Sequence, residues 1–169
     1  MHWNRAGTKL VSASADKTVG IYDASKGVRT KKYAGHSAVV NSCHVSRVGD
    51  PLALSGSDDN MAMLWDMRSR RSVQQFESEF AILAVSFSDN DEVVFTSGID
   101  NVVRAWDRRR EGVVFTLEGH TDSVTGMSLS PDGASLLTNS MDMSLICWDV
   151  RPFVTGSRLL KKFEGHQVK

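Results

Sequence analysis

The sequence predicts an all-β protein in which four similar units of about 42 residues each fold into a four-stranded antiparallel sheet. Two observations lead to this prediction. Short motifs recur along the chain at a nearly constant spacing, and short apolar segments alternate with turn residues within each period.

The repeat is defined by an aromatic residue followed by aspartate. This pair recurs at spacings of 43, 41 and 42 residues, at Tyr22-Asp23, Trp65-Asp66, Trp106-Asp107 and Trp148-Asp149. Six residues before each aromatic residue stands a turn aspartate: Asp16, Asp59, Asp100 and Asp142. Four residues before each of these stands a hydroxyl residue: Ser12, Ser55, Thr96 and Thr138. Gly-His pairs follow the same period, at Gly35-His36, Gly119-His120 and Gly165-His166. Fixed periods of this length are typical of repeat architectures.

The local pattern within a period indicates strands. Apolar or alternating segments rich in β-forming residues occur at Val39–Val45, Ile82–Phe87 and Val124–Leu129. Turn residues separate them, as in Ser88–Asp91 and Ser130–Gly133. No stretch has sustained helical periodicity, so each period is interpreted as four strands, the size of one blade of a β-propeller.

Composition excludes several other classes of protein. Apolar residues make up 41% and charged residues 24% of the chain, and Lys+Arg and Asp+Glu are equal at 20 each. The overall charge therefore favours neither nucleic acid nor acidic lipid. The apolar runs are too short to span a membrane, and two cysteines do not form a disulfide framework. We expect an intracellular soluble protein.

The residues resemble the WD40 family across essentially the whole chain. The resemblance implies blades at residues 1–34, 35–77, 78–118 and 119–169, the first with only a stub of its inner strand. Because the related propellers have seven blades, we expect these residues to be part of a longer propeller. Alone, the chain is expected to form a twofold dimer or soluble aggregates. The alternative is a compact four-bladed monomer.

The resemblance also implies a buried hydrogen-bonded network in each complete blade. Its expected members are His36, Ser55, Asp59 and Trp65, then Thr96, Asp100 and Trp106, then His120, Thr138, Asp142 and Trp148. An indole donates, a hydroxyl and an imidazole both donate and accept, and a carboxylate accepts, so the set can form a chain of hydrogen bonds. Serine, histidine and aspartate could also suggest a hydrolase triad. Because the trio recurs in register with a tryptophan, we interpret it as structural and expect no catalysis.

No pattern predicts a metal or a cofactor. His36, His120 and His166 belong to separate repeats, His2 and His44 stand alone, and no Cys-x-x-Cys or His-x-x-x-His spacing occurs. The two cysteines are expected to be buried thiols because their repeat positions are apolar. Cys43 aligns with Met127, and Cys147 with Ile21, Leu64 and Ala105.

The third period departs from the others. Glu77-Ser78 is assigned to the Gly-His position, and Phe80 aligns with Asp122. Phe80 either turns inward to fill the space of the missing imidazole or lies exposed in a loop on the top face, the face of the turn aspartates. In the second case we expect Phe80, Ile99 and Met141 to form an apolar contact patch for a partner.

Basic residues gather after the aromatic-Asp pairs and in the outer strands, where fourteen of the twenty lie. They form either an ordinary solvated rim or a docking site for an acidic protein or an RNA backbone. Arg108, Arg109 and Arg110 are expected in an exposed loop with little effect on folding. Acidic turn residues should share this bottom face nearer the axis: Asp50, Asp89, Asp91, Glu92 and Asp132.

Some segments are more specific than the repeat. The segment 122–153, DSVTGMSLSPDGASLLTNSMDMSLICWDVRPF, resembles the Prp8-binding WD40 proteins of the spliceosome's U5 small nuclear ribonucleoprotein (snRNP), as do Ser12–Val19, Val39–Cys43 and Ser97–Asn101. The resemblance implies a nuclear scaffold in pre-mRNA splicing. Its partners would be the large Prp8-type subunit and other spliceosomal proteins, without sequence-specific nucleic acid contact and without a membrane.

A second interpretation stays open. Trp65–Arg68, Trp106–Arg109 and Trp148–Arg151 match the Trp-Asp-x-Arg box. This box resembles those of substrate receptors for cullin-4 ubiquitin ligases.

Overall fold

A computed structural model describes residues 1–49, 51–69, 71–110 and 112–165. These residues form four four-stranded antiparallel sheets, which confirms the predicted all-β fold. The part of the chain that the structure describes contains no helix long and apolar enough to cross a membrane.

Each sheet contains four strands in sequence order, from the inner strand to the outer strand. The first sheet comprises β1 (His2–Trp3), β2 (Lys9–Ala13), β3 (Thr18–Asp23) and β4 (Val28–Ala34). The second comprises β5 (Val40–Val45), β6 (Leu52–Ser57), β7 (Met61–Asp66) and β8 (Ser72–Glu77). The third comprises β9 (Ile82–Phe87), β10 (Val93–Gly98), β11 (Val103–Asp107) and β12 (Val113–Leu117). The fourth comprises β13 (Val124–Leu129), β14 (Ser135–Ser140), β15 (Ser144–Asp149) and β16 (Leu159–Glu164).

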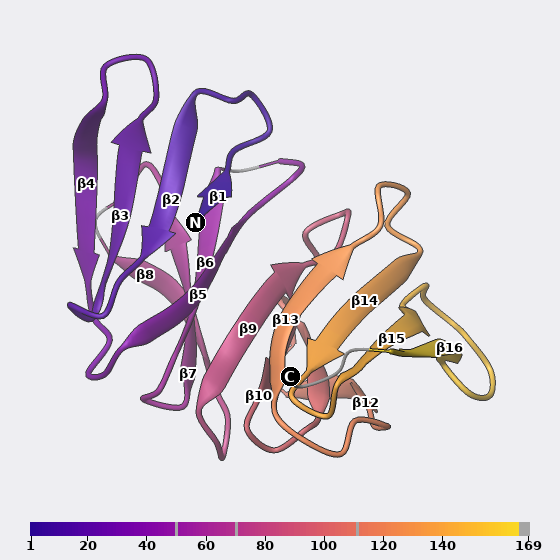
Figure 1. Ribbon diagram of the computed structural model, residues 1–169. Coiled ribbons are helices and arrows are strands. Elements are labelled where there is room, and N and C mark those ends of the chain that lie inside the picture. Colours follow the sequence, from indigo (N-terminus) through magenta and orange to yellow (C-terminus); the bar gives the residue numbers. More distant parts are fainter. Residues whose placement is uncertain (50, 70, 111, 166–169) are drawn as a thin grey trace.

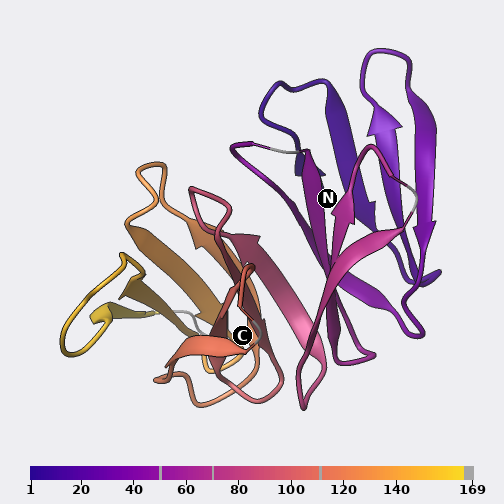
Figure 2. The ribbon, with the colours of Figure 1, turned by 180° about the vertical axis from the view of Figure 1, so that it is seen from behind.

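The sheets follow one another along an open arc, with β1, β5, β9 and β13 on its inner side (Figures 1 and 2). The inner strand β5 packs against β1 and β9, and β9 packs against β13. Both views place the first and fourth sheets at opposite ends of the arc. The closed four-bladed alternative is therefore wrong, because the first and fourth sheets do not meet to close a ring.

Three apolar cores fill the spaces between successive sheets. We call the face of a sheet that packs on the next sheet its forward face, and the opposite face its rear face. Each core lies between the forward face of one sheet and the rear face of the next. The forward faces contribute equivalent positions: Val11, Val19, Ile21 and Tyr33 in the first sheet, Leu54, Ala62, Leu64 and Phe76 in the second, and Phe95, Val103, Ala105 and Leu117 in the third. These side chains are almost fully buried, so sheet-on-sheet packing is the main source of stability.

The strand register corrects one assignment made from the sequence. Met61 pairs with Glu77, as Thr18 pairs with Ala34 and Ser144 with Glu164. Because Ala34 and Glu164 directly precede Gly35 and Gly165, the third sheet's equivalent of Gly-His is Ser78-Glu79 and not Glu77-Ser78. The sequence alignment slipped by one residue because the loop before Ile82 is one residue shorter than the loop before Val124.

Candidate interaction surface

In the second sheet, a histidine connects a loop to the strands behind it. The indole N–H of Trp65 donates to Ser55 Oγ at 2.8 Å, and His36 Nε2 lies 2.7 Å from the same oxygen. His36 Nδ1 lies 2.9 Å from Asp59 Oδ2, which also accepts the backbone N–H of Ser37 at 2.8 Å. The imidazole is almost fully buried and both ring nitrogens are engaged. The loop before β5 is thereby attached to the turn between β6 and β7.

The fourth sheet has the same arrangement. Trp148 donates to Thr138 Oγ1 at 2.9 Å, and His120 lies between Thr138 Oγ1, at 2.8 Å, and Asp142 Oδ2, at 2.9 Å. The backbone N–H of Thr121 donates to Asp142 Oδ2 at 3.0 Å. Neither ring nitrogen is free to accept a proton from a substrate, so the histidine, hydroxyl and carboxylate act as a structural support.

The electrostatics of the turn aspartates fit this structural role. Burial by itself would raise the pKa of Asp142, but hydrogen bonds from Ser144, the Thr121 backbone and His120 outweigh it, and the pKa falls well below its usual range. The pKa of Asp59 is lowered in the same way: burial raises it, and hydrogen bonds from the backbone of Ser37 and from His36 more than compensate.

The third sheet lacks the histidine, and an arginine binds its turn aspartate instead. Trp106 still donates to Thr96 Oγ1, at 2.8 Å. The Asp100 carboxylate forms an ion pair with Arg104, and the two side chains are 10% and 18% exposed. Arg104 lies opposite Thr96 in the strand register, where the other sheets have Gly20, Met63 and Ile146. Arg104 was not among the predicted site residues, although a single charged residue at this position, in the repeat that lacks histidine, was a usable signal.

The ion pair leaves the loop 78–81 without a buried anchor, since both of its partners belong to the sheet itself. Glu79, at the histidine's position, is exposed. Phe80 is 42% exposed, so it does not fill the space of the missing imidazole. The loop is fixed by backbone contacts, in which Ser78 N donates to Asn60 O and Ile99 N donates to Ala81 O.

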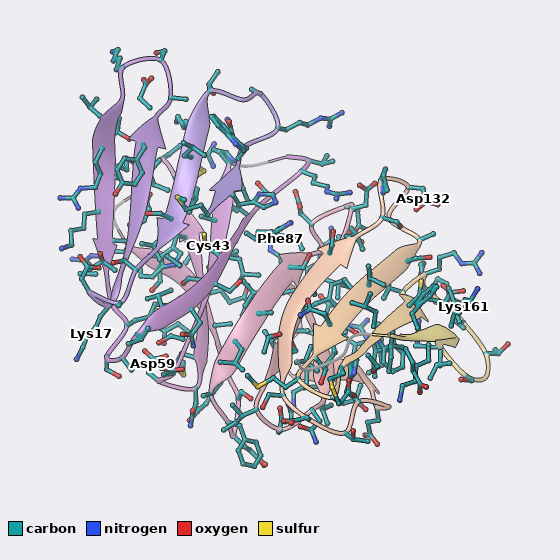
Figure 3. All side chains as sticks on the ribbon, in the orientation of Figure 1. Lys17, Cys43, Asp59, Phe87, Asp132 and Lys161 are labelled. Carbon is teal, nitrogen blue, oxygen red and sulfur yellow. The ribbon has the colours of Figure 1, made fainter. Side chains whose placement is uncertain are left out.

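Ile99 and Met141 are also exposed, by 50% and 65%. Hydrogen bonds connect the loops that carry them: Ile99 N reaches the loop of Phe80, Ser97 Oγ donates to Val124 O, and Met141 N donates to Ser123 O. Figure 3 shows Lys17 and Asp59, from two top-face turns, at one edge of the molecule and Asp132 at the opposite edge. Phe80, Ile99 and Met141 are thus all exposed, and their joint role as an apolar contact patch stays a prediction.

The bottom face contains a buried polar cluster that the sequence did not predict. Asp91, expected among the acidic turn residues of this face, is 3% exposed and accepts the backbone N–H groups of Arg47, at 3.1 Å, and Val48, at 2.9 Å. Burial raises its pKa despite these bonds. The Arg47 guanidinium also reaches the carbonyls of Leu129 and Ser130, both at 3.1 Å, and so connects the second sheet to the fourth.

The arginine run 108–110 is not uniform. Arg108, expected to be exposed, is half-buried, and its guanidinium donates to Asp91 O at 2.8 Å. Arg109 and Arg110 are exposed, and Arg109 pairs with Glu92 at 2.7 Å. Arg108 is therefore part of the bottom cluster, while Arg109 and Arg110 form the exposed part of the rim.

Two histidines expected to stand alone are in contact, with their ring planes tilted by 45°. The rings of His2 and His44 have centroids 4.1 Å apart, and Phe87 N donates to His44 Nδ1 at 3.2 Å. Burial lowers the pKa of His44 to about 3. Among the described residues no group of three or more His, Cys, Asp or Glu side chains could hold a metal ion.

The two cysteines differ, and only one matches the expected burial. Cys43 is buried and Cys147 is half-buried, since it lies on the forward face of the last sheet. Three residues named in the sequence analysis lie outside the described residues. They are Arg70 of the expected basic rim, Asp50 of the expected bottom face and His166 of the repeated Gly-His pair.

The arginines of two Trp-Asp-x-Arg boxes bind the aspartates of their own boxes. Arg68 Nε lies 3.2 Å from Asp66 Oδ1, and Arg151 Nε lies 3.0 Å from Asp149 Oδ1. Hydrogen bonds from Arg151 and its charge hold the pKa of Asp149 at about 2. These arginines therefore have a local structural role.

Comparison with known proteins matches this architecture to a repeat family. The family "WD domain, G-beta repeat" (WD40) matches residues 27–66, 70–107 and 112–149, more than half of the chain. The "U5 small nuclear ribonucleoprotein 40 kDa protein" of Dictyostelium discoideum is 44% identical over 168 residues, which cover 99% of this chain and 47% of that protein.

Two further relatives carry related names. The human "U5 small nuclear ribonucleoprotein 40 kDa protein" is 44% identical over 144 residues, 85% of this chain and 40% of that protein. The "Pre-mRNA-splicing factor cwf17" of Schizosaccharomyces pombe is 36% identical over 165 residues, 98% of this chain and 48% of that protein. The chain thus spans less than half the length of each of these relatives. These comparisons give no support to the cullin-4 ligase alternative.

Proposed function

Because the chain belongs to the WD domain, G-beta repeat (WD40) family, we propose that it is a non-catalytic interaction scaffold of the U5 snRNP and acts in pre-mRNA splicing in the nucleus. The observation that carries the proposal is the 44% identity to the Dictyostelium U5 40 kDa protein, which extends over 99% of this chain. The partners are the large Prp8-type U5 subunit and other spliceosomal proteins.

The geometry of the networks supports a scaffold rather than an enzyme. A general base must be able to reach a proton on a substrate, whereas the imidazoles of His36 and His120 are buried and bonded on both sides. The residues that could suggest hydrolysis are thereby committed to holding loops in place.

The top face supplies the contact surface in this proposal. Phe80, Ile99 and Met141 are exposed side chains on linked loops, and exposed apolar groups of this kind mark interaction sites. Phe80 lies in the loop that has no histidine anchor, so it can adjust to a partner with little disturbance of the sheets. Arg109 and Arg110 provide a second, charged contact at the rim.

Affinity purification from nuclear extract tests the proposal. The chain should retain the large Prp8-type protein, and Phe80→Asp should reduce that capture by about tenfold, because it places a charge at the centre of an apolar contact. Val114→Asp adds the same charge at a 57% exposed side chain of β12, away from the top face, and should capture as wild type does.

Two outcomes would contradict the proposal. Capture of no spliceosomal protein would exclude the splicing role. Capture that stays within about twofold of wild type in Phe80→Asp, less than 1 kcal/mol, would exclude the top-face patch as the interface.

A further inference from the structure

The loop between β15 and β16 is longer than its equivalents in the other sheets. It contains nine residues, 150–158, where the first three sheets have four or five, at 24–27, 67–71 and 108–112. The loop projects from the fourth sheet (Figure 1) and carries Phe153, whose side chain is 96% exposed. Loops that depart from a repeated scaffold are where binding residues concentrate.

A cation–π contact attaches this loop to the third sheet. The guanidinium carbon of Arg158 lies 3.9 Å from the centroid of the Phe115 ring on β12. The same guanidinium donates to the backbone carbonyls of Asp149 and Arg151, both at 3.0 Å. Because a cation is attracted to the face of an aromatic ring, Arg158 holds its loop against the neighbouring sheet.

The loop forms one wall of an open groove of about 770 Å³ between the third and fourth sheets, which we call the bottom groove. Its apolar floor contains Val93, Val114, Phe115 and Val150, and Phe153 lies at its edge. Val93, Phe115 and Val150 pack on the core between the two sheets. The floor is therefore the place where this core reaches the surface, and such an apolar hollow is suited to bind a large side chain.

The inner end of the bottom groove, nearest the inner strands, is acidic. Asp89 and Asp132 come from the turns that follow β9 and β13. These turns are closely packed, since a Cβ at Gly133 would collide with the Cβ of Asp89. The Asp89 side chain is 52% exposed, and Asp132 is exposed too. Hydrogen bonds from the Ser130 hydroxyl and the Ala134 backbone lower the pKa of Asp132, so this carboxylate is charged at neutral pH.

The arginines around the groove do not cancel this charge. Arg47 lies 3.5 Å from Asp89, but its guanidinium is mainly engaged with two backbone carbonyls. Arg110 and Arg151 come from the loops that follow the third strands, at the outer end of the groove, and Arg151 is bound to Asp149. The inner end therefore attracts a cation and repels a phosphate. This chemistry selects a basic side chain of a protein and not the backbone of a nucleic acid.

We propose that the bottom groove binds an extended segment of a partner protein, with a large apolar side chain on its floor and a lysine or arginine beside Asp89 and Asp132. Side chains two residues apart on an extended chain share one face and lie about 7 Å apart. The segment therefore carries its basic residue two positions from its apolar residue. Because the groove lies on the bottom face and Phe80 on the top face, the chain can hold two protein segments at once.

Selection from a randomised library of short peptides, displayed on phage, tests the proposal. The library is first depleted on Val114→Asp, which places a charge on the groove floor at a 57% exposed side chain, and is then selected on the wild-type chain. Depletion removes peptides that bind elsewhere on the chain. Enriched sequences should contain a large apolar residue with a lysine or arginine two positions away. No enrichment, or enrichment of sequences without a basic residue, would overturn the proposal.

Fluorescence anisotropy with an enriched peptide separates the bottom groove from the top face. Val114→Asp should weaken binding by at least about tenfold, because it places a charge in an apolar contact. Phe80→Asp makes the same change on the top face and should stay within about twofold of wild type. In the capture from nuclear extract the two variants should exchange roles, so the groove and the top-face patch are tested separately. A loss of peptide binding in Phe80→Asp would show that the peptide does not bind in the groove.

The charge contact has its own test. The double variant Asp89→Asn with Asp132→Asn removes both charges and keeps side-chain oxygens that accept the same hydrogen bonds. It should bind the enriched peptide about fivefold less tightly. It should bind an analogue with glutamine in place of the basic residue as wild type does. Asp122→Asn, at an exposed aspartate of a top-face loop, is the matched control and should have no effect.

Three results with the double variant and its peptides would overturn the proposal. Unchanged binding of the enriched peptide would show that the carboxylates do not contact its basic residue. An equal loss for the glutamine analogue would show that the variant has damaged the groove and not the charge contact. Displacement of the peptide from the wild-type chain by a short polyuridine RNA would show that the groove accepts a phosphate backbone.

Discussion

The top turns of the second and fourth sheets are held by a histidine from the preceding loop, whereas that of the third sheet is held by an arginine from the sheet itself. His36 and His120 bridge a hydroxyl and a turn aspartate. Arg104 neutralises Asp100 without involving the loop before β9. The charge of the turn aspartate is compensated in both designs, but only the histidine also fixes the loop.

The difference shows how one repeat can change its surface and keep its core. The tryptophan-to-hydroxyl bond is kept in the third sheet, at 2.8 Å, as in the second and fourth sheets, at 2.8 and 2.9 Å, so the sheet-to-sheet packing does not depend on the histidine. The loop 78–81, released from it, carries the exposed Phe80. Phe80, one of the three residues that we propose for partner binding, thus lies where the structural network is incomplete.

Acid titration should produce the largest effect, through the buried imidazole of His44. The pKa of His44 is about 3 in the folded protein, against 6.5 for an ordinary histidine. Its contribution is complete above pH 6.5 and is lost as the pH falls toward 3, because the unfolded chain binds the proton first. Between pH 6.5 and 4 the free energy of unfolding should fall by about 3 kcal/mol. Urea unfolding across this range measures the loss, and His44→Gln should remove most of the slope.

Removal of a network histidine is the next largest effect. His120→Ala leaves Thr138 and Asp142 with a lost partner in a buried site and should destabilise the fold by about 1–3 kcal/mol. Glu79→Ala, at the equivalent position of the third sheet, changes an exposed side chain and should stay within about 0.5 kcal/mol. Equal shifts of the urea midpoint in the two variants would mean that the histidine is not a structural support.

We expect that a histidine at position 79 can replace Arg104 as the partner of Asp100. Arg104→Met introduces the residue that the second sheet has at the equivalent position, Met63, but leaves the Asp100 carboxylate unpaired. It should lower the free energy of unfolding by about 1–2 kcal/mol. The double variant Arg104→Met with Glu79→His supplies an imidazole at the loop position and should recover at least half of the loss. No recovery in thermal or urea unfolding would show that the two arrangements are not interchangeable.

The residue after each turn aspartate offers a smaller test. Lys17, Asn60, Asn101 and Met143 all have a positive φ, between 64° and 67°. Asparagine tolerates this conformation better than methionine. Met143→Asn should therefore stabilise the fold by about 0.5 kcal/mol, and Asn60→Met should destabilise it by a similar amount. A loss of stability in Met143→Asn would show that the Met143 side chain contributes packing that outweighs its backbone strain.

The sequence predicted the features that repeat, because periodic burial and hydrogen bonding leave periodic residues. The columns of Ser55, Asp59 and Trp65 predicted which residues lie near each other. The features it missed arise from single repeats. Arg104, on β11, takes the place of a histidine that in the second and fourth sheets lies in the loop before the inner strand. Asp91 is buried because Arg47 and Arg108, from neighbouring segments, contact it. The assignment of Glu77-Ser78 failed because alignment by motif cannot detect a shortened loop.

Amide hydrogen exchange measures directly whether the third sheet has released a loop that the neighbouring sheets hold in place. Ser37 N and Thr121 N donate to turn carboxylates at 2.8 and 3.0 Å, whereas Phe80 N has only Ser78 Oγ, at 3.4 Å. The amide of Phe80 should exchange at least about tenfold faster than those of Ser37 and Thr121. The double variant Arg104→Met with Glu79→His should slow the exchange of Phe80 toward their rate. Equal exchange of the three amides in the wild-type protein would show that the loop 78–81 is held as firmly as the other two loops.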